Sequence, residues 1–195
     1  MQREASARFL RETKTETGDL NRAWSNAWGA ALAHNPTYAP NASEDMKKQL
    51  RQQARAKVAE IANHYRNRIG ERDHEQNILN LSHSLSAEFS EILRGGQFRI
   101  GTAQKLLNLY LKFLWCFAEV AEPPHCPLDR VVQENAKVRP VVNWTQINSV
   151  EEYHDAIHSL REAVCRLGFS GMALAEWEIR YGWAPIDRLG LEPQN

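Results

Sequence analysis

The chain has 195 residues, and its 24 Lys and Arg balance 24 Asp and Glu, so its formal net charge is zero. A hydrophobic content of 43% with 25% charged residues is ordinary for a globular protein and argues against global disorder. The first residues are charged and carry no apolar run, and the three cysteines form no Cys-x-x-Cys pair. We therefore expect a cytoplasmic protein with reduced thiols and a substantial core.

The zero net charge hides an uneven distribution. Residues 1–70 hold 12 Lys and Arg against 7 Asp and Glu, whereas residues 71–195 hold 12 against 17. The densest positive stretch comprises Lys47, Lys48, Arg51, Arg55, Lys57, Arg66 and Arg68. Such a run is either a solvated helix face or an electrostatic footprint for phosphates, because binding depends on the local field rather than on net charge.

The hydrophobic pattern is helical nearly throughout, without alternating strands or internal repeats, and predicts an all-α fold. The expected helices span residues 2–16, 19–34, 43–69, 78–92, 102–121, a short one from about 128, 149–168 and 170–181. The expected N-caps are Asp19, Ser43 and Ser149, the last forming a capping box with Glu152. Residues 34–41 and 138–148 contain prolines and predict loops, the second with room for a short strand. Gly182 and Pro185 are expected to end the ordered region.

Residues 102–121 are apolar almost all round, which predicts a buried central helix packed on most sides. Lys105, Lys112 and Glu119 leave too short an uncharged run for a membrane span. Lys105 lies in the first turn, where the positive end of the helix dipole and apolar surroundings both disfavour its ammonium form. A lysine whose neutral form is favoured can attack an electrophile, although a lysine at a helix end also commonly extends to water.

Asp129 is the carboxylate that chain length allows to return to Lys105. The helix from Lys105 to Ala121 is about 24 Å long, and the proline-rich loop 122–128 can reach back roughly the same distance. Asp129 also begins a short helix, where backbone N–H groups favour an ionised carboxylate. A lysine beside such a carboxylate can attack a sugar carbon while an oxocarbenium-like cation is stabilised.

The run Ile100-Gly101-Thr102-Ala103-Gln104-Lys105, the apolar helix and Pro127-Leu128-Asp129-Arg130-Val131 resemble the helix-hairpin-helix DNA glycosylases, nearest to their archaeal 8-oxoguanine branch. In that superfamily a lysine opens the helix after the hairpin, and an aspartate follows in a Pro-x-Asp segment. The likeness covers about residues 97–133 and implies that Lys105 is the nucleophile at the sugar C1′ and Asp129 the activating carboxylate. Residues 95–101 stand in place of the family's hairpin with its closely spaced glycines.

The resemblance implies a glycosylase acting on double-stranded DNA with a flipped base, with or without AP-lyase activity, and of the possible oligomeric states we favour a monomer. We expect one helical domain over residues 1–195, which leaves room for two lobes, a basic one over 1–94 and a catalytic one over 95–195. No iron–sulfur cluster is expected, since four clustered cysteines are missing, and we expect no other cofactor and no metal. Some superfamily relatives look adapted to phage defence through removal of hypermodified cytosines such as glucosylated hydroxymethylcytosine, and this chain could be of that kind.

Further candidates follow from base flipping, which requires aromatic faces and polar edges. Those for substrate binding are Gln104, Asn108, Phe98, Trp144 and Arg130, and those for the DNA backbone are Lys47, Lys48, Arg51, Arg55 and Gly101. Core packing, local hydrogen bonding or an ion pair is the simpler role for each. His125 and Cys126 are adjacent, but two ligands without a second pair are weak grounds for a metal site.

Two other functions stay open. Arg68 and His74 have roughly the separation of the active-site pair in HEPN-type ribonucleases. A helical module that binds DNA or a protein through residues 47–68 would need no catalytic residues at all.

Overall fold

The computed structural model describes residues 2–33 and 35–184, and within them the fold is all-α, as the sequence predicts. The α-helices described are α1 (Gln2–Glu12), α2 (Leu20–Leu32), α3 (Glu44–Ala62), α4 (Glu71–Phe89), α5 (Ile100–Cys116), α6 (Arg130–Asn135), α7 (Val150–Arg166) and α8 (Leu174–Trp177). Between them lie the 3-10 turns η1 (Asn63–Arg66), η2 (Ser90–Ile92), η3 (Arg94–Gly96) and η4 (Trp144–Gln146), and a π-helical turn, η5 (Glu178–Gly182), follows α8.

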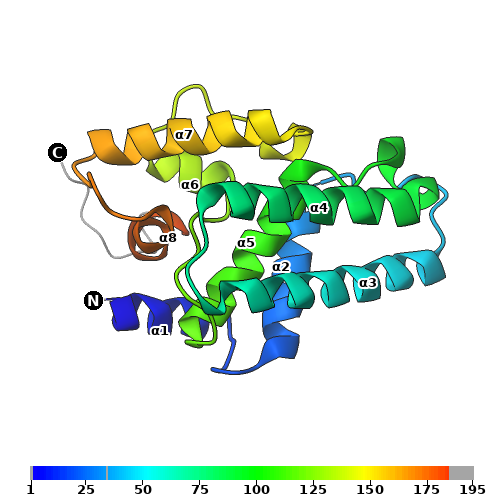
Figure 1. Ribbon diagram of the computed structural model, residues 1–195, viewed down its shortest axis with the longest axis horizontal. Helices are drawn as coiled ribbons and strands as arrows, with labels where there is room; N and C mark the ends of the chain where they lie inside the picture. The colour runs from blue at the N-terminus through cyan, green and yellow to red at the C-terminus, as the bar shows by residue number, and fades with distance from the viewer. Residues whose placement is uncertain (1, 34, 185–195) are drawn as a thin grey trace.

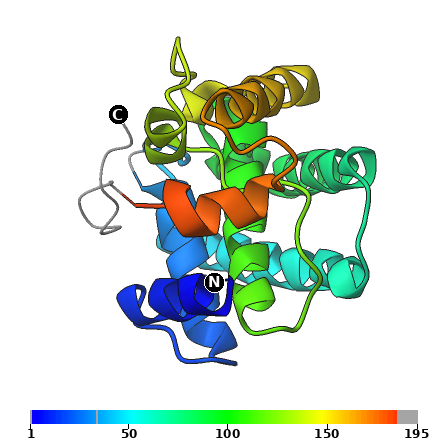
Figure 2. The same cartoon turned by 90° about the vertical axis from the view of Figure 1, so that its left-hand side faces the viewer.

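Helix α5 runs through the middle of the molecule and the other helices surround it (Figure 1). Helix α2 packs along α5, and α4 packs on both α5 and α3. Figure 2 shows α3 and α4 on one side of α5 and α1 on the other, with α8 in front of α5. Fourteen of the 17 residues of α5 are buried, including Lys105 and Lys112, which is the environment that its all-round apolar sequence predicts.

The start and end of α5 differ from the prediction of 102–121. The helix starts at Ile100 and ends at Cys116, because Ala118 adopts a left-handed φ of 63° and the N–H of Glu119 bonds to the carbonyl of Leu114. This closed end turns the chain back, and the N–H of Ala121 then bonds to the carbonyl of Tyr65. The proline-rich loop therefore starts five residues earlier than expected.

The basic helix predicted over 43–69 is also shorter, since α3 ends at Ala62. The Asn63 side chain bonds back to the carbonyl of Ala59, and the following turn η1 directs Tyr65 into the core, where it is 1% exposed. Burial of this aromatic ring outweighs continuation of a polar helix in water. Gly70 then caps α4 rather than ending α3.

The remaining elements follow the sequence more closely. Asp19, Ser43 and Ser149 cap α2, α3 and α7 as predicted, and the capping box with Glu152 is present. The first helix ends at Glu12 rather than at residue 16, and the last helix is α8 followed by η5 rather than one helix over 170–181. Pro185 lies outside the described residues. Within the described residues, no helix is long and apolar enough to cross a membrane.

Candidate active site at the start of helices α5 and α6

Lys105 and Asp129 are in direct contact. The Lys105 Nζ donates a hydrogen bond to Oδ2 of Asp129, and Oδ1 of the same carboxylate accepts the N–H of Val132 at 2.9 Å. Asp129 is therefore the N-cap of α6 and the ion-pair partner of α5 at once. The loop after α5 thus returns to the start of the helix, as its length permits, and places Asp129 beside Lys105.

The pair is mostly enclosed, with side-chain exposures of 9% for Lys105 and 22% for Asp129. Burial alone would raise the pKa of Asp129, but the Lys105 ammonium, its hydrogen bond and the Val132 N–H outweigh burial and hold that pKa below its ordinary value. The carboxylate is thus ionised at neutral pH, and its side chain is more exposed to solvent than that of Lys105.

Gln104 fixes the backbone next to Asp129. Its Nε2 donates to the carbonyl of Leu128 at 2.8 Å, and its Oε1 accepts the N–H of Leu128 at 3.1 Å. A fully buried carboxamide thus satisfies both backbone groups of the residue that precedes the carboxylate. Sequence reasoning placed Gln104 near the site but assigned it to substrate.

A second buried ion pair lies two turns further along α5. Lys112 Nζ is 2.8 Å from Oε1 of Glu178, with side-chain exposures of 5% and 3%, and it lies 4.0 Å from the centre of the Phe9 ring. Seven residues correspond to about 20° of net rotation on a helix, so Lys112 and Lys105 share one face of α5. Sequence reasoning missed this pair, although the spacing of the two lysines was a usable signal.

Of the five residues predicted to bind substrate, three are buried. Phe98 is fully buried and stacks on Trp28 with ring centres 6.4 Å apart, and Gln104 and Asn108 are at most 1% exposed. Trp144 is half-buried in η4, and Arg130 is exposed, with its Nε 2.7 Å from Oε1 of Glu134. Trp144 and Arg130 are thus the two of the five that solvent reaches.

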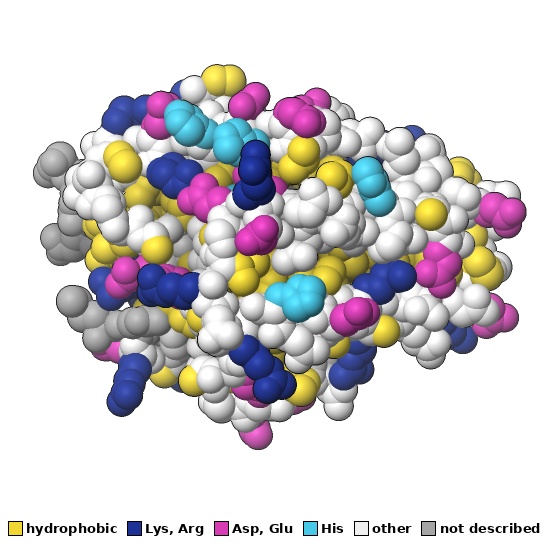
Figure 3. Space-filling model, viewed as in Figure 1, with side chains coloured by type: hydrophobic (Ala, Val, Ile, Leu, Met, Phe, Trp, Pro, Cys, Tyr) yellow, Lys and Arg dark blue, Asp and Glu magenta, His cyan; other side chains and the backbone are white. Residues whose placement is uncertain are grey.

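The Lys and Arg side chains predicted to bind the DNA backbone contact neighbouring residues of α2 and α3. Lys47 and Lys48 pair with acids of the same helix turn, at 2.7 and 3.7 Å. Arg51 donates to Ser25 at 3.2 Å and Arg55 to Asn21 at 2.6 Å, so both guanidinium groups reach across to α2. On the face seen in Figure 3, Lys and Arg side chains are interspersed with Asp and Glu rather than gathered in one patch.

Gly101 was expected to offer its backbone to phosphate, but its N–H donates to the carbonyl of Ile147 at 3.0 Å. A Cβ at this position would lie 1.8 Å from the carbonyl oxygen of Trp144. The glycine is therefore required for close packing of α5 against η4, and its N–H already has a partner.

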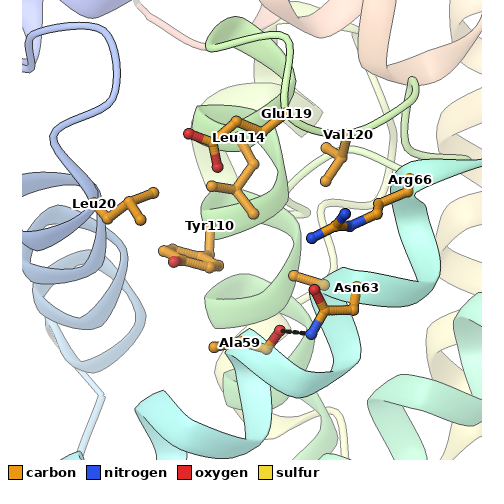
Figure 4. A pocket seen from close by; sticks show the side chains of 9 residues that line it. Leu20, Ala59, Asn63, Arg66, Tyr110, Leu114, Glu119 and Val120 are labelled. Carbon is orange, nitrogen blue, oxygen red and sulfur yellow. Dashed lines mark hydrogen bonds between the residues drawn. The ribbon is translucent and has the colours of Figure 1, made fainter.

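The surface formed by α2 and α3, which carries Arg51 and Arg55, and the Lys105–Asp129 pair lie on different sides of α5. Tyr110 is five residues after Lys105, which corresponds to about 140° around the helix. Its ring, with Leu114, lines a hollow of about 490 Å³ opposite Leu20 and Arg66 (Figure 4). A duplex bound along α3 would thus face this hollow rather than the side of α5 that carries Lys105.

Arg68 and His74, the pair of the ribonuclease alternative, have different environments. His74 is fully buried and its Nδ1 is 2.6 Å from the Tyr65 hydroxyl, whereas Arg68 is exposed, lies before α4 and pairs with Glu122 at 3.1 Å. Within residues 2–33 and 35–184, no three His, Cys, Asp or Glu side chains gather as a metal site requires.

Comparison with known protein families, with curated proteins and with solved structures finds no match to this chain.

Proposed function

We propose that this protein is a DNA glycosylase that excises a damaged or modified base, with Lys105 as the nucleophile and Asp129 as its activating carboxylate. The observation that carries the proposal is the hydrogen-bonded contact between these two side chains at the start of two helices. A lysine paired with a fixed, ionised carboxylate is the group that attack at a sugar carbon requires.

The chemistry begins with a proton transfer. Asp129 takes one proton from the Lys105 ammonium, which frees the lone pair of Nζ. A bond then forms between Nζ and C1′ of the flipped nucleotide as the glycosidic C1′–N bond breaks. The base leaves with the bonding electrons and takes up the proton from Asp129, so the carboxylate is ionised again.

Once the base has left, the regenerated carboxylate stabilises the positive charge on the sugar adduct. The C1′–O4′ bond then breaks while one Nζ proton passes to O4′, which opens the sugar ring and leaves a protonated Schiff base. Elimination from this intermediate would give AP-lyase activity. A water molecule activated by Asp129 in place of Lys105 would give base release alone.

Two of the residues predicted to bind substrate are accessible to solvent. Trp144 is half-buried, and its backbone carbonyl lies against Gly101, one turn before Lys105, whereas Arg130 is exposed and directly follows Asp129. Together they suit a flipped base and a flanking phosphate of duplex DNA. We include hypermodified cytosine of phage DNA among the candidate substrates, and a cytoplasmic monomer as the acting form.

The test is covalent trapping. Duplexes with an abasic site, 8-oxoguanine or glucosylated hydroxymethylcytosine are incubated with the protein and borohydride, which reduces a Schiff base to a stable adduct. We expect an adduct whose mass maps to Lys105, absent in Lys105→Gln, and base release that Asp129→Asn lowers by at least about 100-fold. Lys14→Gln is the matched control, because Lys14 is exposed and lies outside every predicted contact with DNA, so this variant should still give the adduct at Lys105.

Neither adduct nor base release from any of these duplexes would sink the proposal. Base release without an adduct, lost in Asp129→Asn, would assign the attack to water. DNA binding without turnover, unchanged in both variants, would instead favour a helical binding module.

A further inference from the structure

A chain of polar side chains joins the surface at the start of α4 to the backbone that precedes Asp129. It runs through Glu71, His125, Tyr153, Asn108 and Gln104. All but Glu71 are at most 1% exposed. These residues come from α4, the proline-rich loop, α7 and α5, so the chain ties four segments together at the site.

Asn108 holds the Gln104 carboxamide in its place. The Asn108 Nδ2 donates one hydrogen to Oε1 of Gln104 at 3.3 Å and the other to the Tyr153 hydroxyl at 3.1 Å. Oε1 of Gln104 is thereby an acceptor, which fixes its Nε2 as the donor to the Leu128 carbonyl. Asn108 therefore reinforces the orientation of Gln104 that the two backbone groups of Leu128 impose.

Tyr153 completes the sequence of donors. Because its oxygen accepts from Asn108, its own proton is free to go to Nδ1 of His125, 2.9 Å away. His125 then carries its proton on Nε2, which lies 3.8 Å from Oε2 of Glu71. One pattern of donors and acceptors thus satisfies the hydrogen bonds from His125 to Leu128, whereas Glu71 contacts the outer end of this chain at ion-pair distance without a hydrogen bond.

A second tyrosine–histidine pair, Tyr65 and His74, lies beside this chain, but within the described residues it makes no hydrogen bond to Gln104 or Leu128 themselves. Asn77 donates to the Tyr65 hydroxyl at 3.2 Å, and that hydroxyl is 2.6 Å from Nδ1 of His74. Its other end meets the first chain only where His74 packs against His125 and Asn108. Tyr65 and Tyr153 are both at most 1% exposed, so they make a matched pair for substitution.

We propose that Gln104, Asn108 and Tyr153 are positioning residues for Asp129. They hold the backbone of Leu128 so that the Asp129 carboxylate keeps its hydrogen bonds to both Lys105 and the Val132 N–H. The proposal rests on the proposed function only in calling this placement catalytic, because the placement itself can be measured without any substrate.

The physical reason is that Leu128 is fully buried and both its backbone groups are satisfied by Gln104. Without that side chain, two buried backbone groups would lose their partners, and the loop would shift to recover them. A displacement of 1 Å at a reacting group can cost on the order of 100-fold in rate.

The experiment follows the carboxyl carbon of Asp129 by NMR as pH is lowered, with the signal assigned from Asp129→Asn. Gln104→Met and Tyr153→Phe should raise the titration midpoint of Asp129, since its hydrogen bonds loosen while its burial persists. Tyr65→Phe should leave that midpoint at the wild-type value. The ionisable groups that face Asp129, namely Lys105, Lys112, Cys126 and Glu178, are the same in all four proteins.

A midpoint that is unchanged in Gln104→Met, or that rises equally in Tyr65→Phe, would overturn the positioning role. Should Tyr153→Phe fail to fold, Gln104→Met and Asn108→Leu carry the same test. With an active duplex, Gln104→Met should lower the single-turnover rate about 10- to 100-fold. It should also move the acid limb of the rate profile upward, whereas a merely structural defect would lower the active fraction without moving that limb.

The two proposals fail separately. If the wild-type protein releases no base and traps no DNA while the midpoint still rises in Gln104→Met, the positioning of Asp129 stands and the glycosylase function fails. If the protein is active and the midpoint does not move, only the positioning role fails.

Discussion

Helix α5 carries two lysine–carboxylate pairs on one face, and they differ in what surrounds the carboxylate. Asp129 accepts hydrogen bonds from Lys105 and from the Val132 N–H, and its side chain is 22% exposed. Glu178 is 3% exposed, has Lys112 as partner of one oxygen, and its other oxygen, Oε2, has no hydrogen bond. The pKa of Asp129 is lowered, whereas burial raises the pKa of Glu178 despite its lysine.

Both pairs consist of a lysine and a carboxylate, so residue types alone do not distinguish a candidate reactive site from a structural ion pair. A helix N-terminus and a partial opening to solvent keep one carboxylate ionised and reachable. The other is enclosed with its lysine beneath the rings of Phe9 and Trp183. The first pair is therefore the one to which we attach the proposed chemistry, and we expect a structural role for the second.

The largest expected effect comes from breaking the enclosed pair. Lys112→Met leaves the Glu178 carboxylate buried without a partner, and we expect a loss of about 3–5 kcal/mol in the free energy of unfolding. The double variant Lys112→Met, Glu178→Met should recover most of this loss, because an apolar pair needs no desolvation of charge. Urea unfolding followed by circular dichroism measures both. Equal losses in the single and the double variant would contradict the structural role.

A smaller effect is expected at the open pair. Asp129→Asn keeps a side chain able to cap α6 and to accept from Lys105, so we expect a loss of about 1–2 kcal/mol in the same measurement. Activity should fall far more than stability. A variant as unstable as Lys112→Met would show that Asp129 serves mainly to hold the fold together.

The sequence predicts those features that depend on local spacing or chain length. The caps at Asp19, Ser43 and Ser149 follow from residues three or four positions apart, and the central helix follows from its all-round apolar pattern. The meeting of Lys105 and Asp129 follows from counting the helix against its return loop.

Other features depend on contacts that no local pattern records. Glu178 is 66 residues from Lys112, and nothing in its own segment marks it as the partner. The early end of α3 depends on the burial of Tyr65 in the core. The position of the basic residues of α3 relative to Lys105 depends on which side of α5 this helix packs against, and the sequence does not record that side. A helical wheel gives the residues that share a face but not the neighbour that the face meets.

The two pairs should also respond to pH in opposite senses. The folded pKa of Asp129 lies below its ordinary value of 3.8, so its contribution to stability is present above that pH and is lost as pH falls. The folded pKa of Glu178 lies above its ordinary value of 4.5, so its contribution is present at low pH and is lost as pH rises through the folded pKa. Unfolding free energies measured from pH 2.5 to 7 for wild type, Asp129→Asn and Glu178→Gln separate the two slopes. Difference curves of the same sign would contradict the distinction.

The smallest expected effect concerns the Cys126 thiol, whose pKa is influenced by the charges of both ion pairs. It is 1% exposed, and burial raises its pKa well above the ordinary value, whereas Cys165 lies exposed on α7. A thiol reagent at pH 8 should therefore label Cys165 at once and Cys126 only through opening of the structure. If the structure around the Lys105–Asp129 pair opens only during global unfolding, Asp129→Asn should raise the labelling rate of Cys126 by the factor that corresponds to its loss in the free energy of unfolding. A larger acceleration in Asp129→Asn than in Lys112→Met would instead mean that the loop opens locally at Asp129, where the proposed function requires a nucleotide to enter.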